Sequence, residues 1–395
     1  DISGVWGITF LWSLVSALFA EGLRLLYDLP KSQNPLAGSH YYTKSAKVIA
    51  LFFLVTFVYG IFKFFEPRRP FKSINIVAVQ QNIDPWETEE NQSINISKKL
   101  TEEKIAELKA RGQKADIVLW SEGVLGHSFP RSRIYYENNP KDESLTAFIK
   151  RMGVPFIIGG SVRLNIPERK YANAAILFDS DGSYSAFYNK RHLVPFAEGI
   201  PFLENPLMHF FMKEVVGFAS TYTSGSQNII FKIPLSSYQG DECPLEYTQE
   251  RDLLVELDKK GRSSQETREK FIQNKMENPQ SFALFSTPIC FEDSFNDICR
   301  PLYIQGSEIF LNITNDSWSK METAEYQHFI VSSFRAIEYR IPLLRCTNSG
   351  CSAIVDPAGR VSNMLPLFTQ SAFAASIPLY KRQVTYYAKY GDVFA

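Results

Sequence analysis

The segment ALFSTPICFED, residues 283–293, places a cysteine directly after an apolar stretch and directly before two carboxylates. The apolar stretch predicts a buried strand, so Cys290 stands where that strand ends. A lone cysteine is most often a buried structural thiol. The alternative is a nucleophilic thiol, and it depends on which residues end the neighbouring strands.

Two other segments carry a charged residue at the end of a strand. Glu122 follows the apolar run IVLW (117–120) and precedes a glycine-bearing turn. This position, at the carboxyl end of a core strand, suits a general base. Lys190 lies in FYNKRHLVPF (187–196), where an aromatic strand ends. Taken singly, Glu122 is more often a solvated or helix-starting residue, and Lys190 a surface cation.

Together these residues predict one kind of chemistry. A thiol nucleophile needs a base to take its proton and a fixed cation to hold the oxyanion that develops on attack. Glu122, Lys190 and Cys290 supply the base, the cation and the nucleophile. We therefore expect covalent catalysis through a cysteine.

The chain after Pro70 alternates short β-rich runs with polar, helix-like stretches, which indicates an α/β fold. Ser93–Gly112 predicts a surface helix ended by its glycine. The highly charged stretch at about 234–281, which contains KKGRSSQETREK, predicts an inserted surface excursion. The expected buried strands are 74–81, 117–120, 156–162, 175–179, 184–188, 283–287, 309–314, 342–347 and 353–355.

The first 70 residues contain two apolar segments, at about 4–26 and 46–65. Roughly 20 apolar residues are enough to cross the hydrocarbon of a bilayer. We expect two membrane spans joined by a loop within 1–70, and a catalytic domain over 71–395. The alternative is a pair of buried core helices. Basic residues flank the segments on both sides, so the positive-inside rule predicts no orientation.

The charge and cysteine content exclude several classes of partner. Lys plus Arg and Asp plus Glu number 42 each, so no net field draws the chain to nucleic acid. Five cysteines in a chain of this length do not make a disulfide framework, and none forms a pair at metal-ligand spacing. The cysteine spacing therefore indicates neither a disulfide framework nor a cysteine metal site.

The order Glu122, Lys190, Cys290, each at a strand end, resembles the catalytic triad of the nitrilase, or carbon–nitrogen hydrolase, superfamily. The resemblance extends over nearly the whole chain to its membrane branch, the apolipoprotein N-acyltransferases. It implies an αββα sandwich attached to transmembrane helices, with further spans missing at both ends. The segments that carry it are NKRHLVPFAEGIP (189–201), PICFED (288–293), LNITNDSW (311–318), FRAIEYRIPLLRCTNSG (334–350) and AIVDPAGRV (353–361).

The resemblance also implies roles for residues. It makes Glu122 the general base, Lys190 the oxyanion-stabilising cation and Cys290 the acylated nucleophile. The supporting or substrate-binding residues that it implies are Glu198, Glu292, Asn173 and Trp86.

This sequence departs from the family pattern in three ways. Ser121 stands where the family usually has proline, Phe291 stands where tyrosine is usual, and the insertion before Cys290 is longer. None of these departures removes a catalytic group. We expect the loss of the tyrosine hydroxyl to affect how substrate is oriented. We expect the insertion to affect which protein substrate reaches the site.

The implied reaction is the last step of bacterial lipoprotein maturation. A cysteine thioester takes an acyl chain from a phospholipid and passes it to the N-terminal diacylglyceryl-cysteine of an apolipoprotein. The implied enzyme is a monomeric, multi-pass protein of the bacterial inner membrane, with its catalytic domain on the periplasmic side, and it requires no cofactor or metal. The alternatives are an amidase that hydrolyses small amides with the same triad, and a catalytically dead, membrane-anchored binding protein.

Overall fold

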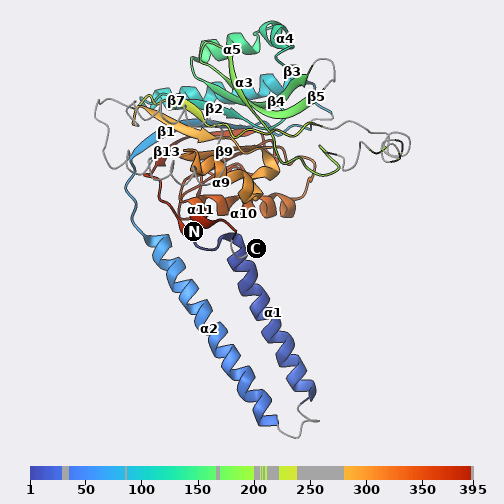
Figure 1. Cartoon of the computed structure of the whole chain (residues 1–395). Coiled ribbons are helices and arrows are strands. Elements are labelled where there is room, and N and C mark those ends of the chain that lie inside the picture. Colours follow the sequence, from blue (N-terminus) through green and yellow to red (C-terminus); the bar gives the residue numbers. More distant parts are fainter. Residues whose placement is uncertain are drawn as a thin grey trace. The chain divides into compact units, whose positions relative to one another are not determined.

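The computed structural model divides the chain into two compact units (Figure 1). The first unit comprises Asp1–Arg69 and Thr385–Ala395, and the second is Pro70–Val384. The segment from Thr385 onward is thus grouped with the helical unit, although the sequence analysis placed it in the catalytic domain. The structure describes residues 1–28, 35–84, 87–165, 170–199, 205, 207, 210, 222–237 and 280–392.

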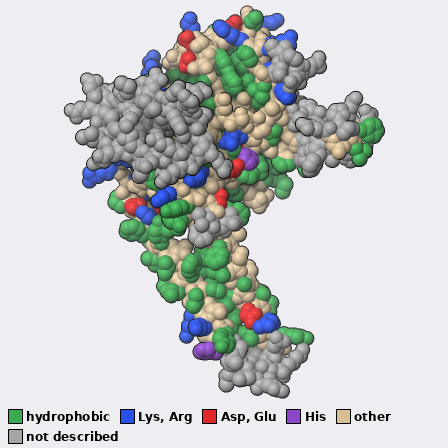
Figure 2. Space-filling model, in the orientation of Figure 1, with side chains coloured by type: hydrophobic (Ala, Val, Ile, Leu, Met, Phe, Trp, Pro, Cys, Tyr) green, Lys and Arg blue, Asp and Glu red, His purple; other side chains and the backbone are tan. Residues whose placement is uncertain are grey.

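Two long helices, α1 (Gly4–Asp28) and α2 (Pro35–Phe65), and the short α11 (Tyr386–Tyr390) form the first unit. The apolar stretches of α1 and α2 have mean hydropathies of 1.4 and 2.3 and are long enough to cross a membrane. Leu11 is the one buried residue among those described in α1 and α2. Hydrophobic side chains therefore gather on the surface of this unit (Figure 2), which is the opposite of a buried core helix.

The first sheet of the second unit has 7 strands in the order β13-β1-β2-β4-β5-β6, with β3 paired to β4. Strands β1, β2 and β4 are parallel, and β5 and β6 follow as antiparallel neighbours. Strands β2 and β6 therefore run in the same direction, so their carboxyl ends lie at the same edge of the sheet. The bounds are β1 (Lys72–Gln80), β2 (Ile117–Trp120), β3 (Leu125–Phe129), β4 (Phe156–Asn165), β5 (Lys170–Phe178), β6 (Tyr184–Asn189) and β13 (Ser371–Leu379).

The second sheet has 6 strands in the order β12-β11-β10-β9-β8-β7. Its centre is the parallel group β8, β9 and β10, and β7 and β11 pair antiparallel to its two edges. The bounds are β7 (Phe231–Pro234), β8 (Phe282–Ser286), β9 (Ile309–Thr314), β10 (Leu343–Thr347), β11 (Ala353–Val355) and β12 (Val361–Ser362).

Successive side chains along a strand point to opposite faces of its sheet, and this alternation places them in two different hydrophobic cores. In β1, Ile74 and Ile76 join the core that the two sheets share, whereas Val77 and Val79 join the core beneath the outer helices. Helices α3 (Glu90–Ala110), α4 (Arg133–Asn138) and α5 (Leu145–Met152) cover the first sheet (Figure 1).

Helices α9 (Asn296–Ile304) and α10 (Glu322–Tyr339) cover the second sheet. The Tyr339 ring of α10 packs against Phe310 of β9 and Tyr303 of α9, at centroid distances of 5.8 and 5.1 Å. The expected αββα sandwich is confirmed.

Several elements differ from the sequence-based prediction. The short strands β3, β7 and β12 and the edge strand β13 were not predicted. Strand β13 is rich in small residues and contains Pro378, which an edge strand tolerates because one side of its backbone needs no ladder partner. Helix α2 begins at Pro35 rather than at 46, because proline fits the first turn of a helix.

The charged stretch expected at 234–281 lies outside the described residues over 238–279, and Trp86 also lies outside them. The two ends of this stretch can be placed. Pro234 of β7 pairs with Phe282 of β8, so the stretch connects two neighbouring antiparallel strands.

Candidate active site

Three strand ends bring the predicted trio to one cavity. Glu122 follows β2, Lys190 follows β6 and Cys290 follows β8, and all three line a cavity of about 870 Å³. Glu122 and Cys290 are each 7% exposed and Lys190 is 1% exposed. The volume lies in the range of roughly 300–1,000 Å³ that is typical of small-molecule sites. Much of the cavity wall is apolar, including Leu125, Val194, Ala197, Phe291, Trp318 and Val331.

A buried carboxylate, Glu122, and a partly buried one, Glu198, share one ammonium group and one amide. Lys190 Nζ lies 3.1 Å from Glu122 Oε1 and 2.8 Å from Glu198 Oε2. Asn173 of β5 donates from Nδ2 to Glu122 Oε1 and to Glu198 Oε1, both at 2.6 Å. The structure thus brings Asn173 and Glu198 into contact with Glu122 and Lys190, and these contacts hold the four side chains in a fixed arrangement.

Burial and mutual charge set the protonation of this group. Burial raises the pKa of the Glu122 carboxyl, and Lys190 opposes this effect. Burial lowers the pKa of Lys190, but Glu122, Cys290 and Glu198 outweigh burial and leave it well above its usual value. Burial and Glu122 raise the pKa of the Cys290 thiol well above its usual value, against Lys190. These shifts favour an ammonium at Lys190 and a protonated thiol at Cys290, and Glu122 lies beside them as the candidate base.

The backbone at Cys290 has a left-handed conformation with φ 50°, which non-glycine residues rarely adopt. The residue begins a single 3-10 turn, η3 (Cys290–Ser294), directly after the bridge between Ile289 and Ile313. Such local strain persists only where surrounding contacts hold it, and it is common at functional sites.

Glu292 supplies contacts that hold the turn. Its carboxylate is completely buried and accepts hydrogen bonds from Tyr188 Oη at 2.9 Å and from the Ile289 N–H at 2.8 Å. It also accepts the N–H groups of Arg191 and His192, at 2.5 and 3.1 Å. Glu292 therefore ties the turn of the thiol to the strand end that carries the lysine, and it does not line the cavity itself.

Glu122 is held by two features that the sequence analysis did not single out. The Asn315 N–H donates to Glu122 Oε2 at 2.8 Å. Gly159 of β4 passes so close that a Cβ atom there would lie 2.4 Å from Glu122 Cα. The only sequence signal for Asn315 is its place in the LNITNDSW segment, and a backbone N–H leaves no mark on the side-chain pattern.

Both substitutions relative to the family pattern are accommodated. Ser121 is fully buried, and its hydroxyl accepts a hydrogen bond from Gln81 Nε2 at 2.7 Å. Phe291 lines the cavity and packs edge-to-face on Phe295, with ring centroids 4.7 Å apart. An aromatic ring without a hydroxyl therefore adds apolar surface beside the thiol.

One group of described residues has the spacing of metal ligands. Atoms of Cys290, Asp316 and His328 lie within 4.8 Å of one another. Arg345 Nη2 already lies 2.7 Å from Asp316 Oδ2 and 2.8 Å from His328 Nδ1. A guanidinium at this position opposes a second cation, so these residues do not fit a metal ion.

Comparisons with known proteins show the family to which this chain belongs. The family model described as carbon–nitrogen hydrolase matches residues 76–387. The apolipoprotein N-acyltransferase 2 of Treponema denticola is 34% identical over 393 residues, which cover 99% of this chain and 66% of that protein. The apolipoprotein N-acyltransferase 2 of Treponema pallidum is 30% identical over 422 residues, which cover 99% of this chain and 65% of that protein.

The chain therefore spans slightly less than two thirds of the length of these relatives. Among solved structures, Saccharomyces cerevisiae Nit3, described as a member of branch 10 of the nitrilase superfamily, aligns with a TM-score of 0.45 and 14% identity. That alignment covers 78% of this chain and 91% of Nit3. From the family match over most of its length, the chain belongs to the carbon–nitrogen hydrolase family.

Proposed function

We propose that this protein transfers a fatty acyl chain from a phospholipid to the N-terminal amino group of a diacylglyceryl-modified apolipoprotein, through a thioester on Cys290. One observation carries the proposal. Cys290 opens onto a largely apolar cavity that also contains the buried Lys190–Glu122 pair. The names of the relatives in Treponema support the same substrates.

In the first half-reaction, Glu122 takes the proton of the Cys290 thiol, and the thiolate attacks the ester carbonyl carbon of the phospholipid. Lys190 stabilises the oxyanion of the tetrahedral intermediate. The intermediate collapses, the carbon–oxygen bond to the glycerol breaks, and Glu122 returns its proton to the departing alkoxide. A lysophospholipid leaves, and the thioester remains.

In the second half-reaction, the amino group of the acceptor attacks the thioester carbonyl, and Lys190 again stabilises the oxyanion. Glu122 takes a proton from the attacking amine and gives it to the departing sulfur of Cys290. The products are an amide and the original thiol. A thioester is reactive enough for an amine, and apolar walls limit its loss to water.

We propose further that α1 and α2 cross the bacterial cytoplasmic membrane, within a multi-pass protein whose second unit faces the periplasm. Their length, apolar character and exposed side chains support the spanning role. We also propose that the enzyme works as a monomer. A lipid donor requires a site that is reached from the bilayer, and membrane spans supply that proximity.

Intact-mass spectrometry tests the proposal. Purified protein incubated with phospholipid alone should gain the mass of one fatty acyl chain, and neutral hydroxylamine should remove it. Cys290→Ala should gain no mass, whereas the matched control Cys299→Ala, which removes another buried thiol, should still be acylated. Acylation of a cysteine other than Cys290 would refute the proposed nucleophile.

The same adduct separates acyl transfer from hydrolysis. Addition of a peptide with a diacylglyceryl-modified N-terminal cysteine should discharge the thioester and yield the triacylated product. Discharge by water at the same rate as by this amine would instead favour an amidase. Absence of any adduct on folded wild-type protein would favour the dead binding protein.

A further inference from the structure

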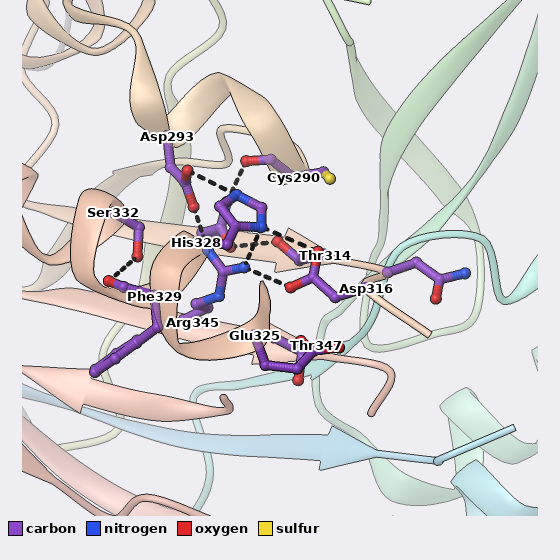
Figure 3. A network of polar contacts seen from close by, with 12 residues as sticks. Cys290, Asp293, Thr314, Asp316, Glu325, His328, Phe329, Ser332, Arg345 and Thr347 are labelled. Carbon is purple, nitrogen blue, oxygen red and sulfur yellow. Dashed lines mark hydrogen bonds and ion pairs between the residues drawn. The ribbon is translucent and has the colours of Figure 1, made fainter. Parts of the chain in front are cut away.

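A second cluster of charged side chains lies beside Cys290, on the elements of the second sheet. Arg345 of β10 contacts Asp293 Oδ2 with Nη1 at 2.5 Å and Asp316 Oδ2 with Nη2 at 2.7 Å. His328 of α10 contacts the same two aspartates, at 3.2 and 3.0 Å (Figure 3). The proposed half-reactions assign no role to these residues.

The two carboxylates that Arg345 holds belong to the two segments that must meet for catalysis. Asp293 lies in η3, the turn that the proposed nucleophile begins. Asp316 directly follows Asn315, whose N–H donates to Oε2 of the proposed base at 2.8 Å. One guanidinium therefore joins the turn of the nucleophile to the loop that holds the base.

The position of Arg345 makes it a rigid link. Its side chain is completely buried and starts from the central parallel strands, where Arg345 is paired with Asn312 of β9. A guanidinium is planar and presents its donors in a fixed fork, whereas a lysine offers a single point charge. Only an arginine at this position can hold both aspartates at defined angles.

The charges within the cluster balance. Burial and Arg345 lower the pKa of His328, but Asp293 and Asp316 outweigh them and raise it to about 9. Burial raises the pKa of Asp316, but Arg345 and His328 bring it down to about 2. At neutral pH the arginine and the imidazolium thus offset two carboxylates, which is the condition for keeping charges out of water.

Other ionisable groups face the cluster and the thiol. Glu325 of α10 lies next to Asp316, and Cys351 follows β10. Across the cavity, the Cys290 thiol also faces Lys190 and Glu122. Arg345 and Lys190 favour the thiolate, and Asp316 and Glu122 oppose it.

We propose that Arg345 is a positioning residue that sets both the placement and the charge environment of Cys290 relative to the base. The part of this proposal that concerns acylation rests on the proposed function. The part that concerns the thiol itself does not, because alkylation of a thiol needs no lipid substrate.

Two substitutions separate the charge of the guanidinium from the planar arrangement of its hydrogen-bond donors. Arg345→Met removes both, and Arg345→Lys keeps the charge alone. The matched control is Arg335→Met, which breaks another buried pair in the same unit, with Glu338 at 2.9 Å, and faces Cys299 rather than the nucleophile. Each variant is prepared as the full chain and its folding is checked by thermal melting.

The rate of Cys290 alkylation by iodoacetamide, measured by peptide mass mapping across a range of pH, reports the ionisation of the thiol. The pH midpoint of this rate is the quantity compared between variants. Arg345 lowers the pKa of the Cys290 thiol, so its loss should raise the pH midpoint of alkylation by about 1 unit in Arg345→Met. Arg345→Lys should restore most of that shift. Acylation by phospholipid should fall about 100-fold in Arg345→Met and remain reduced by at least about 10-fold in Arg345→Lys, because small misplacements are costly. Arg335→Met should change neither quantity.

A wild-type midpoint in folded Arg345→Met, or an equal shift in Arg335→Met, would overturn the proposal. If Arg345→Met does not fold, Asp316→Asn decides. It removes an anion beside the thiol, so the midpoint should fall while acylation slows, and an unchanged or higher midpoint contradicts the proposal. If wild-type Cys290 is alkylated normally but phospholipid never acylates it, the proposed function fails. The alkylation midpoints then test the proposed role of Arg345 on their own.

Discussion

Replacing Lys190 by methionine should separate the electrostatic role of this residue from its packing. Methionine keeps most of the side-chain volume but removes the ammonium that lies 3.1 Å from Glu122 Oε1 and 2.8 Å from Glu198 Oε2. Breaking a buried ion pair by removing one partner costs about 3–5 kcal/mol, since the remaining charge is uncompensated. A domain has roughly 5–15 kcal/mol of stability, so the loss should be plain in an unfolding titration.

The same experiment includes a compensating variant. In Lys190→Met combined with Glu198→Gln, one of the two uncompensated carboxylates is gone, so at least about 1 kcal/mol of the lost stability should return. Acylation by phospholipid should stay absent in both, because the oxyanion still lacks its cation. Recovery of the adduct in the double variant would contradict the role proposed for the lysine.

A matched control distinguishes this site from buried ion pairs in general. Lys72 Nζ lies 2.8 Å from Glu308 Oε2, the two side chains are 4% and 1% exposed, and neither lines the cavity. Lys72→Met should lose a similar amount of stability and keep its acylation. The reasoning is refuted if the free energy of unfolding of Lys190→Met lies within about 1 kcal/mol of the wild-type value, since breaking a buried, ionised pair costs more than that.

Three further predictions follow from single observations. Gly159→Ala should lose about 1–3 kcal/mol of stability and most of its acylation, because the added Cβ would lie 2.4 Å from Glu122 Cα. The control Gly60→Ala should lose neither, because a Cβ there would have nothing within 4 Å. Equal losses in the two variants would refute the role of the close contact at Gly159. Burial raises the pKa of Glu325 to about 7, so the folded chain keeps a proton that the unfolded chain releases near 4.5, and this carboxyl makes stability fall as pH rises through that window. Glu325→Gln should remove this contribution to the pH dependence of the free energy of unfolding. Identical pH dependences in the wild type and Glu325→Gln would contradict the prediction. Alkaline phosphatase fused after Ala395 should be active if the second unit faces the periplasm, and an active cytoplasmic reporter at the same junction would refute the proposed topology.

The sequence by itself determined the local features of this protein. The apolar runs of α1 and α2, the alternation of strands and helices, and the three strand ends at Glu122, Lys190 and Cys290 were all readable, because each depends on neighbours a few residues away. Strands β3, β7, β12 and β13 escaped the prediction, because short or small-residue strands lack a strong apolar pattern. The insertion predicted at about 234–281, of which 238–279 lies outside the described residues, and the role of Trp86 stay as sequence-based predictions.

Only the tertiary structure decided which groups meet. Strand order and direction place β2 and β6 with their carboxyl ends at one edge, and the packing of two sheets brings Cys290 to the same cavity. The N–H of Asn315 reaches Glu122 through a backbone group, which has no signature in the sequence. Arg345 stands among apolar residues of β10, and nothing in the sequence tells a solvated arginine from one that clamps Asp293 and Asp316. Contacts between residues far apart in the chain arise from register and packing, which are properties of the whole fold.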